Sequence, residues 1–159
     1  MRIDHSTFAA MHPKSIASTS VLYNGAAAAS ANGIPVSDAT EVRLSVHVGA
    51  VSVSQTGIAI GLYASPNSTN VSSSSALVAV DNAIMAITKA KENSVLQGRI
   101  QAGKIPSVEG YENDPHYLYV KYAQETADAV LVEAVVETAG HQSSPVDPVE
   151  GTTAFVFDI

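Results

Sequence analysis

Five histidines are the side chains in this chain most able to ligate a metal ion or to transfer protons: His5, His12, His47, His116 and His141. Two imidazoles aim at one ion most simply when they stand two residues apart on a strand or four apart on a helix. None of the five has a partner at either spacing. The histidines therefore predict isolated surface or interface side chains, and no metal site.

Acidic residues give two further candidates for chemistry. Glu109, Glu112 and Asp114 cluster in one turn region and could offer oxygen ligands to Ca²⁺, but the segment lacks the dense Asp/Asn/Gly pattern of a dedicated calcium loop. Glu133 and Glu137 are four residues apart, so on a strand they share a face without converging on one bond. No nucleophile elbow, phosphate loop or dinucleotide fingerprint occurs. We predict no catalytic residue and no cofactor, and hence a protein that is not an enzyme.

Tyrosines are concentrated in one short region, where four of the six fall within twelve residues: Tyr111, Tyr117, Tyr119 and Tyr122. Tyr117 and Tyr119 alternate with Leu118 and Val120, so the two tyrosines share the face opposite the core-directed pair. Exposed, paired tyrosines suit a protein interface or a platform on which sugars stack. The alternative is that they cover a sheet between two loops.

The composition narrows the classes of partner. Eight Lys and Arg face fifteen Asp and Glu, for a formal net charge of −7, and the basic residues are scattered singly. Nucleic acid is therefore not an expected partner, because phosphate binding needs clustered cations. No apolar run approaches the ~20 residues of a membrane span, and no secretory signal is visible, so we expect no membrane contact and folding in the cytoplasm. Cysteine is absent, so disulfides are excluded.

The strongest structural signal is Glu41–Val48, in which apolar and polar residues alternate without a fault. This pattern predicts a strand with one buried and one wet face. In the strand expected at Gly57–Ala64, the face opposite Ile58, Ile60 and Leu62 carries only Gly, Ala and Tyr. No Asp, Glu, Lys or Arg occurs from residue 44 to 80. Such a face suggests contact with another chain or sheet; a strand buried on both sides is the alternative.

Alternation and turn residues predict further strands at Thr19–Tyr23, Ala76–Val80, Gly98–Ile105, His116–Ala123, Asp128–Thr138 and Thr152–Asp158. Residues 81–91 fit either one or two helical turns or a strand. Many short strands with turn-rich connections are typical of an all-β domain. We predict a single antiparallel β-sandwich, jelly-roll-like, over residues 19–159.

Residues 1–18 carry large apolar side chains at Ile3, Phe8, Met11 and Ile16 with no sustained period, and a proline at position 13. They predict an irregular N-terminal arm. Such an arm is either a frayed terminus or a segment that orders by docking Phe8 and Met11 onto a neighbour.

The C-terminal half resembles the Bordetella-phage-type capsid cement family. The members of this family are small decoration proteins of tailed bacteriophages. Members share a Tyr-Leu-x-Val/Leu-x-Tyr strand after a Pro-containing turn, followed by a valine-rich strand. Here the matching runs are Gln97–Pro106, His116–Tyr122 and Ala129–Glu137, within a similarity that covers residues 40–138.

The resemblance implies a structural virion protein: a β-sandwich knob, as a homotrimer, on the outside of an icosahedral head assembled in the host cytoplasm. Its partner would be the major capsid protein, whose subunit contacts it would stabilise. The candidate partner-facing residues are Ile3, Phe8, Met11, Ile16, Tyr117 and Tyr119. A carbohydrate- or receptor-binding β-sandwich module of a virion or cell surface is the alternative function.

Overall fold

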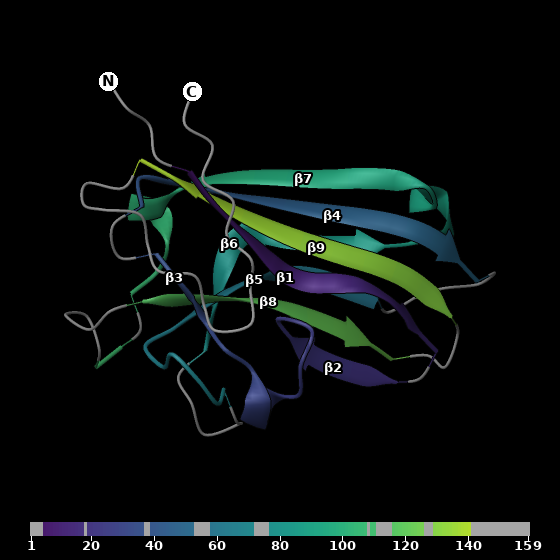
Figure 1. The fold of residues 1–159 in the computed structure, drawn as a ribbon, viewed down its shortest axis with the longest axis horizontal. Coiled ribbons are helices and arrows are strands. Elements are labelled where there is room, and N and C mark those ends of the chain that lie inside the picture. Colours follow the sequence, from purple (N-terminus) through teal and green to yellow (C-terminus); the bar gives the residue numbers. More distant parts are fainter. Residues whose placement is uncertain are drawn as a thin grey trace.

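A computed structural model describes residues 5–17, 19–36, 39–52, 58–71, 77–107, 109–110, 116–125 and 129–140. These residues form two antiparallel sheets stacked face to face (Figure 1). The first sheet contains, in order, β1 (His5–Ile16), β9 (Val130–Ala139), β4 (Glu41–Val51) and β7 (Ser94–Gln101). The second contains β2 (Ser20–Tyr23), β8 (Tyr117–Gln124), β5 (Ile58–Ser65) and β6 (Val78–Ile87), with β3 (Ile34–Pro35) also paired to β8. The predicted all-β sandwich is confirmed.

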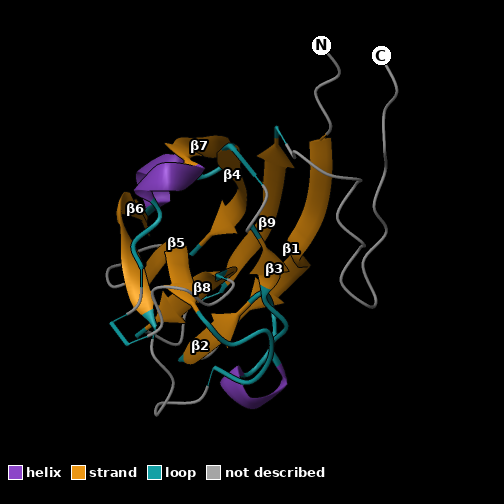
Figure 2. Ribbon diagram, turned by 90° about the vertical axis from the view of Figure 1, so that its left-hand side faces the viewer, coloured by secondary structure: helices purple, strands orange, loops and turns teal. Residues whose placement is uncertain are grey.

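Strand pairing is nested along the chain. β1 pairs with β9, β2 with β8, β4 with β7, and β5 with β6. Pairs β4–β9 and β5–β8 then join these four ribbons into the two sheets. Seen from the side, the layers lie close at the edge where β6 leads into β7 (Figure 2). At that edge a side-chain carbon added to Gly98 would lie 3.1 Å from the Met85 methyl group.

The core lies between the sheets and follows from alternation in the strands. On β4 the buried side chains include Val42, Leu44, Val46 and Val48, as the sequence predicts. Their cross-strand neighbours on β9 are also buried, and β5 and β8 supply the opposing layer of Ile, Leu, Val and Tyr side chains. One contiguous apolar cluster therefore spans both sheets. Each fully buried Val, Leu or Ile side chain contributes about 1.5–3 kcal/mol to the stability of the folded state.

The prediction of an irregular arm is wrong for residues 5–16, which form β1 and pair along its length with β9. Two bulges explain why the pattern was missed, one between Ala9 and Met11 and one between Met11 and Lys14. Each inserts one extra residue, so Phe8, Met11 and Ile16 all point inward although their spacings of three and five are odd. A search for strict alternation cannot register such a strand.

Several other strand boundaries differ from the predicted ones. β6 runs through the ambiguous segment to Ile87, and only Lys89–Lys91 forms a 3₁₀ turn. β7 begins at Ser94, earlier than predicted, and ends before a second 3₁₀ turn at Ala102–Lys104. A third such turn, Ala28–Ser30, lies between β2 and β3. The strand predicted at Thr152–Asp158 lies outside the described residues.

Replacing Val132 with Asp tests the assignment of β9. Val132 is 1% exposed, so the substitution buries an unpaired carboxylate at a cost of several kcal/mol against a typical total of about 5–15. Circular dichroism should show that the variant is unfolded. Its matched control is Leu131→Asp on the adjacent position, where the side chain is 41% exposed and the fold should survive. A folded, soluble Val132→Asp protein would show that the inward face of β9 is misassigned.

Candidate interaction surface

The side chains proposed from the sequence to face a partner are mostly interior. Phe8, Met11 and Ile16 are buried in the cluster between the sheets, where β1 places them. They are core residues of this chain and do not form a docking arm. Ile3 lies outside the described residues.

Tyr119 is also buried, so the two tyrosines do not form an exposed pair. Its ring packs with Ala31 and Val71, and its hydroxyl donates a 2.7 Å hydrogen bond to the Asn67 carbonyl oxygen. Tyr117 is half-buried beside it. Gly33 allows this packing, because a side-chain carbon there would lie 2.8 Å from the Tyr119 hydroxyl oxygen. The loops therefore cover the tyrosines, which removes the sugar-stacking pair predicted as one alternative.

A different surface, the solvent side of the second sheet, has the character expected of an interface. We call it the outer face; its residues are Val21, Tyr23, Ala59, Gly61, Tyr63, Ile84, Ala86, Lys121 and Ala123. Strand register places them side by side, with Ala86, Ala59, Ala123 and Val21 in one row across four strands. Val21 and Ile84 are each about half exposed. Small side chains in a continuous row leave a flat apolar surface that another backbone can approach closely.

Lys121 is the single charged residue of this outer face as defined. Its ammonium nitrogen lies 5.8 Å from the centre of the Tyr23 ring and 5.0 Å from that of Tyr63. Both distances suit cation–π attraction, which partly offsets the loss of water around the charge. The aromatic rings therefore hold the ammonium group against the sheet.

The solvent side of the first sheet is chemically the opposite. Arg43 and Glu137 form an ion pair at 3.5 Å, and His47 Nδ1 lies 3.1 Å from Glu133. Arg99 pairs with Glu41 at the same end of β4 and β7. Glu133 and Glu137 thus each face a cationic or ionisable partner on β4, and not each other. This charged surface is what a sheet open to water normally carries, which makes the outer face, with Lys121 as its one charged residue, distinctive.

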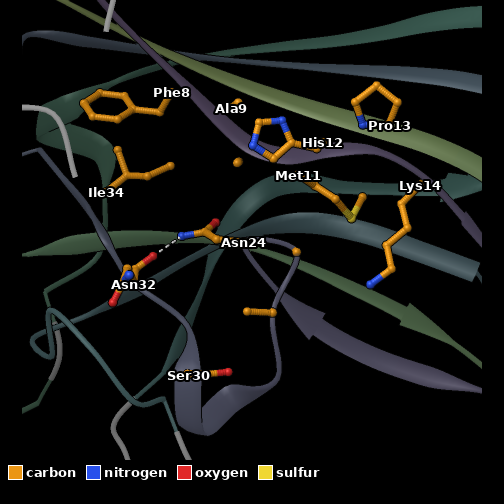
Figure 3. A pocket seen from close by; sticks show the side chains of 13 residues that line it. Phe8, Ala9, Met11, His12, Pro13, Lys14, Asn24, Ser30, Asn32 and Ile34 are labelled. Atoms are coloured by element: carbon orange, nitrogen blue, oxygen red, sulfur yellow. Dashed lines mark hydrogen bonds between the residues drawn. The ribbon is translucent and has the colours of Figure 1, made fainter. Parts of the chain in front are cut away.

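A groove of about 330 Å³ lies between β1 and the connection from β2 to β3 (Figure 3). Phe8, Met11 and Ile34 line its apolar part, while His12 and Lys14 lie along β1 on the side open to solvent. Its volume is at the lower end of the range for ligand-binding cavities. The bulges of β1 and Pro13 form one wall of this groove.

Asn24 fixes the other wall. Its side-chain nitrogen donates to the carbonyl oxygens of Asn32 at 2.6 Å and Leu118 at 3.3 Å, and its side-chain oxygen accepts the Val120 amide at 2.7 Å. The backbone of Asn24 has φ +46°, a conformation that Asn adopts more readily than most residues. This one side chain ties the turn after β2 to both β8 and the segment before β3.

The described residues contain no group of three or more His, Cys, Asp or Glu that could hold a metal ion. In the same part of the chain no helix is both long and apolar enough to cross a membrane. Comparisons with protein-family models, curated proteins and solved structures found no match to this chain. Within the described residues, the outer face and the groove are two candidate sites, and each is interpreted from its own chemistry.

Alkaline titration tests the burial of the tyrosines. Burial raises the pKa of Tyr119 to about 12, with a smaller contribution from Tyr117, and burial likewise raises the pKa of Tyr122 to about 12. In the unfolded chain a tyrosine ionises near pH 10. The folded state therefore binds the phenol protons more tightly, and the stability that this confers is present below pH ~10 and falls as the pH rises towards ~12.

Phenolate absorbance should show that the buried tyrosines ionise only at the pH at which circular dichroism shows the protein unfolding. Tyr119→Phe and Tyr122→Phe should each remove one of these late-titrating groups. Ionisation of every tyrosine near pH ~10 in a protein that stays folded would contradict the burial.

Substitution of Asn24 tests the groove wall. Asn24→Ala removes three hydrogen bonds of about 0.5–1.5 kcal/mol each, so we expect a loss of about 1.5–4.5 kcal/mol in the free energy of unfolding. Asn32→Ala is the control, because Asn32 takes part through its backbone carbonyl, which the substitution keeps. Urea unfolding measures both, and equal stabilities would show that the Asn24 contacts are unimportant.

Proposed function

We propose that this chain is a capsid cement protein that binds the outer surface of an icosahedral phage head and stabilises contacts between major capsid subunits. The observation that carries this proposal is the outer face, a flat and nearly uncharged surface on a rigid sandwich. The resemblance to phage decoration proteins names the partner, and the outer face offers the surface on which that partner would be bound.

The strand pairing supports the finer description of the fold as a jelly roll. With β3 set aside, the eight remaining strands pair as one nested ribbon folded into two four-stranded sheets. Jelly rolls recur in viral capsid and lectin domains. This analogy favours a structural or binding role in general, and the choice between the two depends on the surfaces.

Cementing requires modest contacts made many times. Burial of apolar area against the shell favours the intact shell, and all of that area must be exposed again before the subunits separate. A homotrimer would bind through three such faces at once, which raises avidity without strong single contacts. The net charge of −7 opposes binding to packaged DNA, and a chain without cysteine suits assembly in a host cytoplasm.

A carbohydrate- or receptor-binding module is less well supported. Its predicted platform needed both Tyr117 and Tyr119 at the surface, and Tyr119 is buried. The rings of Tyr23 and Tyr63 on the outer face are already engaged with Lys121. We therefore prefer the cement function.

Replacing Ala59 with Glu places a charge in the middle of the outer face. The folded protein should keep its circular dichroism spectrum, while its affinity for purified heads should fall at least about tenfold, because a buried, unpaired carboxylate costs more than the 1.4 kcal/mol that this factor represents. Sedimentation of heads with bound protein, over a series of protein concentrations, measures the affinity. Density and heat resistance of heads with and without the chain test the stabilising role itself.

Val95→Glu is the matched control, since Val95 is 54% exposed on β7 at the edge of the other sheet. It should bind heads as the unmodified chain does. Full occupancy by Ala59→Glu, or equal loss in both variants, would exclude the outer face as the capsid contact. Retention of the unmodified chain on polysaccharide, with no binding to heads, would favour the alternative function.

A further inference from the structure

Among the described strands, β7 is the edge strand with the fewest features that block pairing with another chain. The strands at the ends of the two sheets are β1 and β7 in the first and β2 and β6 in the second (Figure 1). β1 carries two bulges and Pro13, β2 has four residues, and the pairing of β6 with β5 is irregular. β7 runs for eight residues in unbroken register with β4 and contains no proline. Such an edge is a template for a further strand.

The inward side chains of β7 also lack a neighbour on the open side. Leu96 and Ile100 pack against the core but are only partly buried, whereas Val46 and Val42, opposite them on β4, are fully buried. The difference follows from position, because β4 has a strand on each side and β7, within the described part of the chain, has one. A strand added beyond β7 would therefore cover apolar surface as well as supply backbone hydrogen bonds.

The sequence of β7 is complementary to itself in antiparallel pairing. When Gly98 stands opposite Gly98 of a second copy, Leu96 faces Ile100 on the inner side of the joined sheet. On the outer side Gln97 then faces Arg99, so an amide oxygen can accept from a guanidinium. Both kinds of cross-strand pair are favourable, and each occurs twice because the contact is symmetric.

The neighbouring registers are less favourable. The two that keep the inner sides together centre the contact on residue 99 or on residue 97. The first sets Arg99 opposite its own copy, and the second sets Arg99 opposite Val95. Within its own chain Arg99 is already paired with Glu41, so the preferred register leaves its charge compensated.

We propose that two copies of this chain pair antiparallel through β7, about a two-fold axis at Gly98, so that their two four-stranded sheets become one continuous sheet. A two-fold contact uses the same surface on both copies and closes at two chains. The outer face belongs to the other sheet and remains exposed. This inference does not depend on the capsid role; in a homotrimer, β7 would join chains of two different trimers.

The chain contains no cysteine, so single introduced thiols can report the register in the full-length protein. One variant carries Gln97→Cys and another Arg99→Cys, both at exposed positions. Mixed under mild oxidation, they should form a disulfide between the two variants at least about tenfold faster than either variant forms one alone, because pairing sets residue 97 opposite residue 99. Intact mass and peptide mapping identify the products.

A mixture of Gln97→Cys with Leu131→Cys is the control, because Leu131 is 41% exposed on β9 and away from the β7 edge. It should react only at the slow rate of random collision. Equal rates for the two mixtures, or fastest cross-linking within a single variant, would overturn the proposal.

A charge placed in the contact gives a second measurement. Gln97→Lys sets a cation opposite Arg99 of the other copy at two symmetric places, and like charges directly opposite destabilise a strand pair. The dissociation constant of the two-fold contact, from sedimentation equilibrium, should rise at least about fivefold. Gln101→Lys is the matched control, since position 101 stands opposite Val95, and it should leave the constant unchanged. An association unaffected by Gln97→Lys, or weakened equally by both substitutions, would refute pairing in this register.

Discussion

Burial of the inward side chains of β4 and β9 against those of β5 and β8 holds the two sheets together, and every candidate site depends on it. These four strands occupy the central positions of their sheets, so each is paired on both sides. Their backbone groups are satisfied within the sheets, and their inner side chains are almost completely excluded from water. With the middle fixed in this way, functional variation is confined to the two solvent faces and to the edges.

The two sheets have the same strand geometry, but their solvent-facing surfaces differ in chemical character. On the first sheet, Arg43 and Glu137 meet across β4 and β9, and such exposed pairs add at most about 1 kcal/mol each. These ion pairs mainly make the surface of the first sheet compatible with water, and they contribute little to the stability of the fold. On the second sheet the corresponding positions hold Ala, Gly and Ile, which leave apolar surface in contact with water. A protein that only needed to remain folded and soluble would gain nothing from this difference, which is why the outer face is the stronger candidate for a partner.

Sequence reasoning succeeded where local pattern and final position coincide. The strict alternation of β4, the Ile-Ala-Ile-Gly-Leu run of β5 and the valine-rich β9 each identified a strand and its buried face. The uncharged face of β5 is likewise evident from the sequence alone. The sequence leaves two interpretations of Tyr119 open, an exposed platform or a covered ring, because its covering residues, Gly33 and Asn67, are distant in the chain and give no signal at positions 117–122. The alternation of residues predicts which side chains share a face of a strand. Contacts between residues distant in the chain determine whether that face is exposed to solvent.

β1 shows how one irregularity produces several effects. Its two bulges shift the apolar residues off a two-residue period, so the sequence suggested an arm. The same bulges, with Pro13 and Lys14, make the outer edge of β1 a poor template for another strand, which protects the sheet from edge-to-edge association. They also leave space between β1 and the Asn24 turn, and this space is the groove. A regular β1 would have been easy to predict, but it would have left a flat edge to the sheet and no groove beside the Asn24 turn.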